Sequence, residues 1–186
     1  MSPFPNISAE DDNVSLWSLQ CFLINECEVR LGPSASDKQV YQPVFNSDNG
    51  GPVIINTPEL DGAFASLSRA ARTYWPTTLY ELAHETVHLL DPTVGPTNFL
   101  EEGFAVHFSV DMSKAYTNHQ QQPSCPFYLE AWHLIKSISN DVYGAGALIR
   151  TKFGKLSLAK PKGLMVLFPN MHSADAERLC SQFSQK

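Results

Sequence analysis

His84-Glu85-Thr86-Val87-His88 is a His-Glu-x-x-His run whose two histidines are four residues apart. On an α-helix, side chains at positions i and i+4 lie one above the other on the same face, so both imidazoles can reach one metal ion. Glu85 directly follows the first histidine and can take a proton from a metal-bound water. If this stretch is helical, it predicts a zinc hydrolase with His84 and His88 as ligands and Glu85 as general base.

The flanking residues favour a helix over residues 78–91. Thr77 or Thr78 is a candidate N-cap, with Glu81 in the first turn as part of a capping box. Pro92 ends the run. Apolar residues recur at helical spacing, at Leu79, Leu82, Ala83, Val87 and Leu90. The alternative is a helix whose histidines lie in a polar patch without a metal, because short motifs also occur by chance.

The two histidines require a third ligand elsewhere, because a catalytic zinc usually takes three protein ligands and keeps the fourth position for water. A metzincin would have a third histidine six residues after the second and a glycine three residues before it. Asp91 and Val94 stand at those positions, which excludes that class. An upstream cysteine ligand, as in peptide deformylases, is disfavoured because the nearest one, Cys27, lacks the expected glycine-rich context.

A second helix, predicted over residues 98–114, supplies carboxylates. Asn98 is a good N-cap, Glu101 stands at the capping-box position, and apolar residues follow at helical spacing. The first turn of this helix carries Glu101 and Glu102, followed by Gly103-Phe104-Ala105. One of the two carboxylates is therefore the candidate third ligand.

With a Glu-Gly-Phe-Ala run behind a helical His-Glu-x-x-His motif, the chain resembles the gluzincins. These are the thermolysin-like and aminopeptidase-like zinc metallopeptidases, and the resemblance, to a minimal single-domain form, covers about residues 50–157. It implies that Glu102, directly before Gly103, is the third zinc ligand. It also places Glu101 where many gluzincins have an asparagine that orients a zinc-bound histidine, a role that a carboxylate can fill. Two alternatives remain: Glu101 only caps the helix, or it binds the metal in place of Glu102.

The same resemblance implies a catalytic role for Tyr143. In gluzincin aminopeptidases, the tyrosine of a Tyr-x-x-Gly-Ala helix start donates a hydrogen bond to the oxyanion of the tetrahedral intermediate. Tyr143, followed by Gly146-Ala147, matches this pattern, and a preorganised donor of this kind lowers the barrier substantially. The alternative is a half-buried structural tyrosine. Arg150, on the same predicted helix, is expected to form a structural ion pair.

The predicted reaction is hydrolysis of a peptide bond in a peptide or protein substrate. Aminopeptidases of this clan bind the free amino terminus with a glutamate on the strand that borders the cleft, in a Gly-x-Met-Glu-Asn run. The corresponding residues 51–56 contain no glutamate, which favours an endopeptidase that binds an extended peptide along an edge strand. The alternatives are a catalytically inactive zincin-fold binding or regulatory module, which would not need Glu85, and a zinc hydrolase of non-peptide amides.

Composition sets the class of protein. The 186 residues, 43% of them hydrophobic, suit one globular domain, and the net charge of −6 argues against nucleic acid as a partner. No apolar run reaches the roughly 18 residues of a membrane span, and the first residues lack the features of a signal peptide. Four cysteines without Cys-x-x-Cys spacing, of which Cys21 and Cys27 are expected to be buried, favour the cytoplasm. A secreted or delivered form stays open, and the oligomeric state is not predicted.

The predicted fold class is α+β: a small mixed sheet with an edge strand over the cleft, followed by a mainly helical, zincin-like catalytic domain. Residues 1–13, rich in Pro, Asp and Asn, are predicted to be a flexible tail, and residues 14–186 one domain. Two strands, 40–45 and 52–56, are expected to be joined by a hairpin-type turn. The expected helices are 14–31, 60–72, 78–91, 98–114, 126–139, 142–153 and 174–184.

Overall fold

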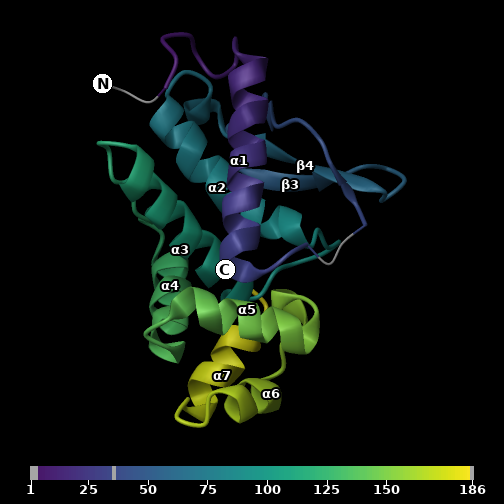
Figure 1. Ribbon diagram of the computed structural model, residues 1–186, viewed down its shortest axis with the longest axis vertical. Helices are drawn as coiled ribbons and strands as arrows, with labels where there is room; N and C mark the ends of the chain where they lie inside the picture. Colours follow the sequence, from purple (N-terminus) through teal and green to yellow (C-terminus); the bar gives the residue numbers. More distant parts are fainter. Residues whose placement is uncertain (1–3, 35–36, 185–186) are drawn as a thin grey trace.

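The computed structural model describes residues 4–34 and 37–184 and has a mixed α+β architecture (Figure 1). The helices are α1 (Asn13–Leu31), α2 (Trp75–Leu90), α3 (Phe99–Tyr116), α4 (Pro126–Ile138), α5 (Val142–Phe153), α6 (Pro161–Leu167) and α7 (Ser173–Cys180). The strands are β1 (Gln39–Val40), β2 (Val44–Phe45), β3 (Val53–Asn56) and β4 (Gly62–Leu67). Short 3₁₀ turns lie at Arg69–Ala71 and Leu156–Leu158.

The sheet is built around β4. β1 and β2 pair with one edge of β4 in parallel, and β3 pairs with the other edge in antiparallel fashion, with Ile54 opposite Ala65. The expected strand 40–45 is therefore two short strands, separated by residues that include Pro43, which has no backbone N–H to donate. The expected hairpin between 40–45 and 52–56 is wrong, because β4 lies between the two.

The helix expected over residues 60–72 is also wrong, since this segment contains β4 and the first 3₁₀ turn. Five of the six β4 residues are buried, because the strand lies in the middle of the sheet with α2 packed against it. A buried strand loses the alternation of polar and apolar residues, and its short apolar run then looks like a piece of buried helix. Ala63 and Ala65 are also good helix formers, which makes this run harder to distinguish from a helix.

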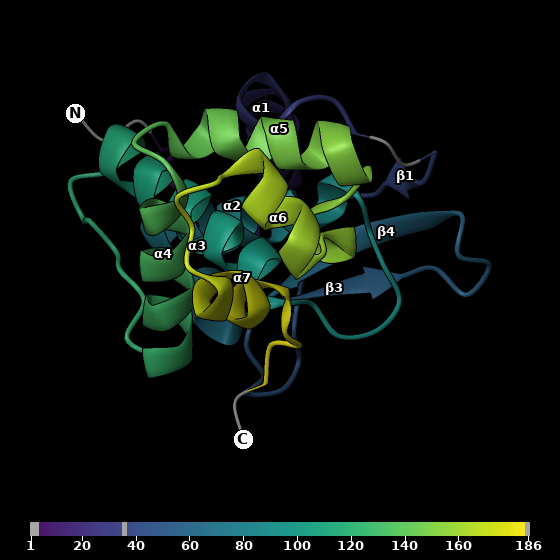
Figure 2. The same ribbon diagram turned by 90° about the horizontal axis from the view of Figure 1, so that it is seen from below.

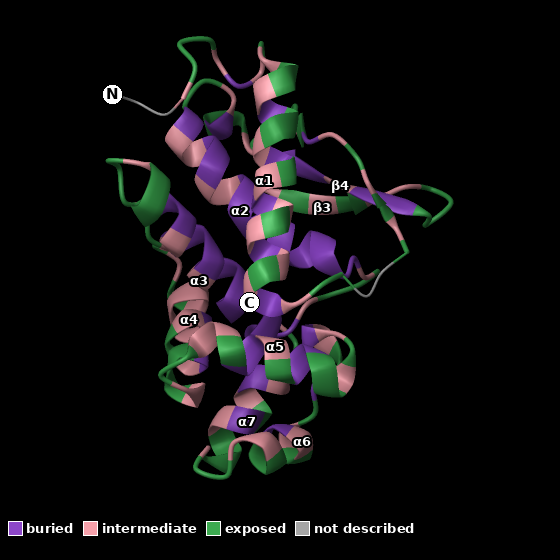
Figure 3. Ribbon diagram, viewed as in Figure 1, coloured by how far each residue is buried: buried purple, intermediate pink, exposed green. Residues whose placement is uncertain are grey.

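α2 is the central helix and lies between α1, α3 and the sheet. All residues from 82 to 90 are buried, so the His-Glu-x-x-His run lies in the interior (Figure 3). The helix begins at Trp75, three residues before the predicted start, with Pro76 in its first turn. Neither Thr77 nor Thr78 is the N-cap, because that position is taken by Tyr74. The Thr78 hydroxyl donates to the carbonyl of Ala71, and the Glu81 carboxylate accepts from Ser68 instead of forming a capping box.

α3 packs against α2 on one side and α4 on the other. Its predicted N-cap is confirmed, because the Asn98 side chain accepts a hydrogen bond from the backbone N–H of Glu101. The remaining helices gather at one end of the molecule, where α5, α6 and α7 lie (Figure 2). α4 and α5 match the predicted helices closely, α7 ends earlier, at Cys180, and α6 was not predicted.

Residues 4–12 are not the flexible tail that their composition suggested. Ala9 is fully buried, Phe4 stacks on Trp75, and the indole N–H of Trp75 donates to the carbonyl of Ile7. Asp12 caps α1 by accepting from the backbone N–H of Ser15. The N-terminal segment therefore belongs to the domain from residue 4 onward, and the first three residues of the predicted tail lie outside the described part.

The cysteines are all free thiols. Cys21 and Cys27 were both predicted to be buried, and the prediction is correct for Cys27 only. Cys27 is buried against the core, whereas Cys21 lies on the exposed side of α1. None of the helices within residues 4–34 and 37–184 is both long and apolar enough to span a membrane.

Candidate metal centre

α2 and α3 bring His84, His88 and Glu102 together. His84 Nε2 lies 3.2 Å from Glu102 Oε2, and His88 Nε2 lies 3.6 Å from Glu102 Oε1. One ligand atom from each residue lies within 4.8 Å of the other two. A tetrahedral zinc with bonds of about 2.0–2.2 Å separates its ligand atoms by roughly 3.4 Å. The spacing of the three side chains therefore fits coordination of one ion.

Glu102 has a buried oxygen without a hydrogen-bond partner among the described residues. Oε1 accepts from the hydroxyl of Thr97, but Oε2 receives no hydrogen bond from the part of the chain that is described. Although His84 Nε2 is only 3.2 Å away, the two atoms are not aligned as donor and acceptor. An unpaired buried carboxylate oxygen is costly. A cation held between Glu102 and the histidines would satisfy it.

Glu101 lies behind His88. Its Oε1 is 2.7 Å from His88 Nδ1, and since an ionised carboxylate can only accept, we assign the proton to Nδ1. When the imidazole is neutral, the lone pair of Nε2 is then on the side that faces Glu102. This arrangement is the one expected of a residue that orients a metal-binding histidine, and it leaves Glu102 as the carboxylate beside both Nε2 atoms.

Without a metal, His88 holds a proton strongly and Glu102 stays ionised beside it. Burial alone would lower the pKa of His88, but the charge of Glu102 and the hydrogen bond with Glu101 outweigh burial and raise that pKa well above its ordinary value. Burial would raise the pKa of Glu102, yet the neighbouring His88 and His84 keep it far below its usual range. A metal ion must displace a proton from these groups, so its affinity falls as the pH falls.

Glu85 is buried beside the cluster and lines the same pocket. Burial raises the pKa of its carboxyl above the ordinary value, and the nearby His84 and His88 oppose that shift. A carboxyl whose pKa moves toward neutrality is better suited to take and return a proton at physiological pH. Glu85 is therefore the carboxyl at this cluster that can exchange a proton with a ligand in the pocket.

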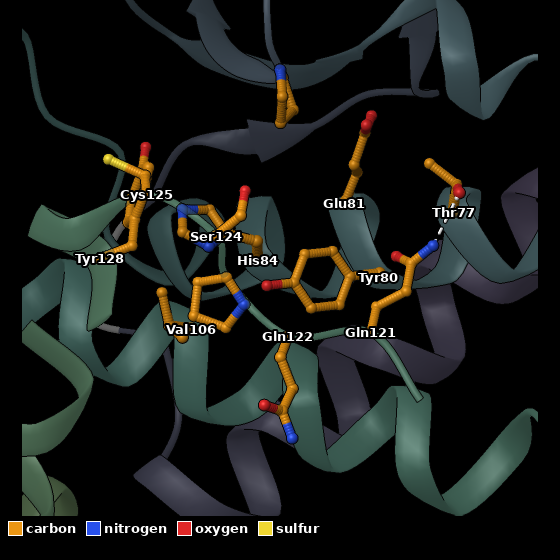
Figure 4. Close-up of a pocket in the computed structure, with 12 residues that line it drawn as sticks. Thr77, Tyr80, Glu81, His84, Val106, Gln121, Gln122, Ser124, Cys125 and Tyr128 are labelled. Carbon is orange, nitrogen blue, oxygen red and sulfur yellow. Dashed lines mark hydrogen bonds between the residues drawn. The ribbon is translucent and has the colours of Figure 1, made fainter. Parts of the chain in front are cut away.

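Two adjoining pockets open onto the cluster. The first, which we call the metal pocket, has a volume of about 280 Å³ and lies between residues 52–54, at the start of β3, and the α2–α3 linker, residues 92–97. The second, the side pocket, has a volume of about 330 Å³ (Figure 4). The two share Pro52, His84 and Tyr128. An elongated cleft thus runs past the candidate ligands, with β3 as the strand that borders it.

Tyr143, the predicted oxyanion donor, does not reach this cleft. Its hydroxyl donates to Asp111 at 2.8 Å, and its ring packs against His107 with the centroids 4.9 Å apart. It lines neither the metal pocket nor the side pocket. α5 packs against α1 and α4, and Asp111, the partner of Tyr143, lies nine residues after Glu102 on α3. The structure therefore favours the alternative of a half-buried structural tyrosine.

Tyr128, which was not singled out from the sequence, is the tyrosine beside the cluster. It lies in the first turns of α4, and its ring meets the His84 ring edge-on, with centroids 5.6 Å apart. It lines both pockets. No local signal marks this residue, because it follows a loop 44 residues after His84 and only the packing of α4 on α3 brings it there.

Comparisons of the chain with protein-family models, curated proteins and solved structures find no match. What the site can do therefore follows from its own residues. Two imidazoles and a carboxylate converge on one point, and a buried carboxyl and a phenol lie next to them. The cleft leaves room for an extended ligand.

Proposed function

We propose that this chain is a zinc-dependent peptidase of the gluzincin type, with His84, His88 and Glu102 as zinc ligands and peptide bonds inside a chain as its targets. The observation that carries the proposal is the approach of the three ligand atoms to within 4.8 Å, at a cleft that also contains the buried carboxyl of Glu85. The sequence resemblance to gluzincins has the same ligand order along the chain. Zinc in such a site lowers the pKa of a coordinated water to about 7.

Glu85 and Glu101 have separate tasks in this proposal. Glu85 accepts the proton of the attacking water and later delivers it to the leaving amine, as a general base and then a general acid. Glu101 holds His88 through Nδ1 and so keeps Nε2 turned toward the ligand position. Both tasks need a carboxylate kept away from bulk water, and both residues are buried.

Tyr128 takes the role first expected of Tyr143. Its ring borders the cleft beside His84, where a substrate carbonyl would lie. A phenol in this position can donate a hydrogen bond to the oxygen on which negative charge develops, which stabilises the transition state more than the ground state.

β3 provides backbone groups for an extended peptide. The N–H of Thr57 donates to the carbonyl of Gly62, which identifies one hydrogen-bonded pair of the β3–β4 ladder. Because such pairs alternate in antiparallel strands, Val53 and Ile55 bond to β4 and the backbone groups of Ile54 point to the other edge. Among the described strands only β4 pairs with β3, so this edge can bind substrate as an added strand.

The decisive test combines metal analysis with peptide cleavage. We expect about one zinc per chain in the purified protein and in Glu85→Gln, and cleavage of internal bonds in a peptide library by the wild type only. The substitution should lower the rate by about 10²–10⁴-fold, the contribution of a positioned general base. Glu59→Gln, in an exposed loop, is the matched control and should behave as wild type.

Further variants separate the ligands from the other groups. Glu102→Ala should lose zinc, while Tyr128→Phe should keep zinc and cleave more slowly. The proposal is wrong if the protein binds no zinc when zinc is supplied, or if Glu85→Gln cleaves as fast as the wild type. If Glu102→Ala retains its zinc, the third ligand is a different residue.

A further inference from the structure

The side pocket is positioned to receive one substrate side chain. It meets the metal pocket at Pro52, His84 and Tyr128, so it opens next to the place where the scissile bond would lie. A peptide extended along β3 turns alternate side chains to the two sides of its backbone. One residue at or next to the scissile bond therefore directs its side chain into this pocket.

The walls of the side pocket suit a long aliphatic chain. Tyr80, Val106, Pro123 and Tyr128 contribute apolar surface, and Figure 4 shows the labelled Tyr80, Val106 and Tyr128 around the cavity. A volume of about 330 Å³ is near the lower end of the range for pockets that bind small ligands. Such walls pack against the methylene groups of a side chain and leave its tip for polar contacts.

Glu81 is the acidic residue of this pocket. Its Oε2 accepts from the backbone N–H of Ser68 at 2.8 Å and its Oε1 from the Ser68 hydroxyl at 2.5 Å, so the carboxylate is held in one orientation. Each carboxylate oxygen of Glu81 can accept a second hydrogen bond. No lysine or arginine in residues 4–34 and 37–184 forms an ion pair with Glu81, and none lines the pocket.

The charge of Glu81 decides which ligands fit. An apolar side chain would cover the carboxylate without replacing its lost hydration, and an acidic one would repel it. An ammonium or guanidinium group would form charge-assisted hydrogen bonds with the remaining acceptor positions. Thr77, Gln121, Gln122 and Ser124 also line the pocket and carry no charge, and His84 is the candidate metal ligand that this pocket shares with the metal pocket.

We propose that the side pocket selects a lysine or arginine of the substrate next to the scissile bond, and that Glu81 is the residue that recognises its charge. This inference rests on the proposed peptidase function and names the substrate class for it. Glu81 lies one helical turn before His84 on α2, so the recognition site and the candidate metal site are held by the same rigid helix.

The test uses peptides that differ at one position and are blocked by acetyl and amide groups at their ends. The variable residue next to the cleaved bond is Lys, Arg, Gln, Leu or Glu. For the wild type we expect kcat/KM for Lys and Arg to exceed that for Leu by about 10- to 100-fold, the worth of a charge-assisted hydrogen bond. Glu81→Gln should remove most of this ratio, Glu81→Lys should favour the Glu peptide, and Glu59→Gln should change nothing.

A binding measurement tests the recognition of lysine by Glu81 independently of peptide cleavage. Fluorescence anisotropy with the Glu85→Gln protein should show tighter binding of the Lys peptide than of the Leu peptide, and the added substitution Glu81→Gln should abolish the difference. Zinc content and circular dichroism of each variant check the fold.

The outcomes separate the two proposals. If the zinc-loaded wild type cleaves no peptide, the peptidase proposal fails, and the anisotropy comparison alone supports or overturns the recognition by Glu81. If peptides are cleaved or bound without preference for Lys and Arg, or if that preference survives Glu81→Gln, this inference is overturned and the peptidase stands. If the blocked peptides resist cleavage and only versions with a free amino terminus are cleaved, Glu81 is assigned to the terminal amine and the side-chain proposal is overturned.

Discussion

Glu101 and Glu102 are neighbours of identical chemistry with different surroundings. Successive residues on an α-helix point about 100° apart, so one carboxylate meets both Nε2 atoms while the other lies behind His88. The two side chains therefore support the same candidate metal site from different sides. In sequence they were alternatives for one role; in the structure each has its own partner.

Removing the Glu101 carboxylate should weaken zinc binding without deleting a ligand. Glu101→Ala should lower zinc affinity by about 10- to 100-fold, the usual effect of losing a group that orients a ligand. Glu101→Gln should retain part of the affinity, because its carbonyl can still accept from Nδ1. Competition with a chelating dye measures the Kd, with Glu59→Gln as control. An unchanged Kd for Glu101→Ala would contradict the assigned role.

Arg150 forms the structural ion pair expected of it. Its guanidinium donates to Asp91 at the end of α2 and to the carbonyls of Leu31, Gly32 and Pro33 at the end of α1. Arg150→Ala should cost about 3–5 kcal/mol of unfolding free energy, because a buried carboxylate loses its partner. Lys152→Ala, an exposed position on the same helix, should stay within about 0.5 kcal/mol. Urea unfolding measures both, and equal losses would show that Arg150 is not a stabilising link.

The cysteines should differ strongly in reactivity toward iodoacetamide. Cys21 is exposed, whereas burial raises the pKa of Cys27 and brings that of Cys180 to about 11. Only the thiolate reacts, so at pH 8 about one Cys180 in a thousand is reactive, and its labelling should rise about tenfold per pH unit toward pH 11. Mass spectrometry should find Cys21 labelled first and Cys27 only after unfolding. Rapid labelling of Cys27 in the folded protein would contradict its burial.

α3 is the element that links the site to the rest of the fold. Its first turn carries both carboxylates, and its other side lies close to α4, which supplies Tyr128. Gly103 allows this approach: a Cβ at this position would lie 2.6 Å from the carbonyl oxygen of Ala131 and from Ile135 Cγ2. The glycine after Glu102 therefore has a packing role that is independent of any metal.

Gly103→Ala tests the close contact between α3 and α4. Alanine is the better helix former by about 1 kcal/mol, yet the clash with α4 should dominate and destabilise the protein by about 1–3 kcal/mol. Gly51→Ala, where a Cβ has no neighbour within 4 Å, should be nearly neutral. Thermal unfolding followed by circular dichroism measures both variants. A stabilised Gly103→Ala would show that α3 and α4 leave room for a Cβ at this position.

For the molecule as a whole, the cleft is assembled from segments that are distant in the chain. β3 forms one border, α2 the floor, and the linker after α2 and the loop before α4 the two ends. The N-terminal segment is not among them, since residues 4–12 pack on Trp75 and Arg72 instead. Residues 4–12 therefore lie outside both pockets.

Deleting residues 1–11 should reduce stability and leave the site intact. The loss of the hydrogen bond to Trp75, the partly exposed Glu10–Arg72 pair and the apolar contacts of Ala9 should cost about 1–3 kcal/mol. Zinc content and peptide cleavage at 20 °C should match the full chain. A truncated protein with higher activity would instead indicate that the segment restrains the enzyme.

Several features of the fold and of the candidate site were predictable because they are local. The helical spacing of His84 and His88, the Asn98 N-cap and the limits of α5 depend on residues a few positions apart, and the structure confirms these features. The failures have a common cause. Residues 62–67 have the pattern of a helix but form a strand that other strands cover on both edges. Tyr143 matches a catalytic pattern, but its hydroxyl donates to Asp111 and the residue lines neither pocket.

The sequence by itself determined most of the helices, the order of the candidate ligands and the presence of a carboxyl between two histidines. Only the tertiary structure decided that Glu102 meets both Nε2 atoms while Glu101 supports His88, that Tyr128 borders the cluster, and that Glu81 faces a pocket beside it. Helix periodicity and capping act within a few residues of the chain. The surroundings of a side chain depend on how whole elements pack, and that packing is set by contacts between residues far apart in sequence.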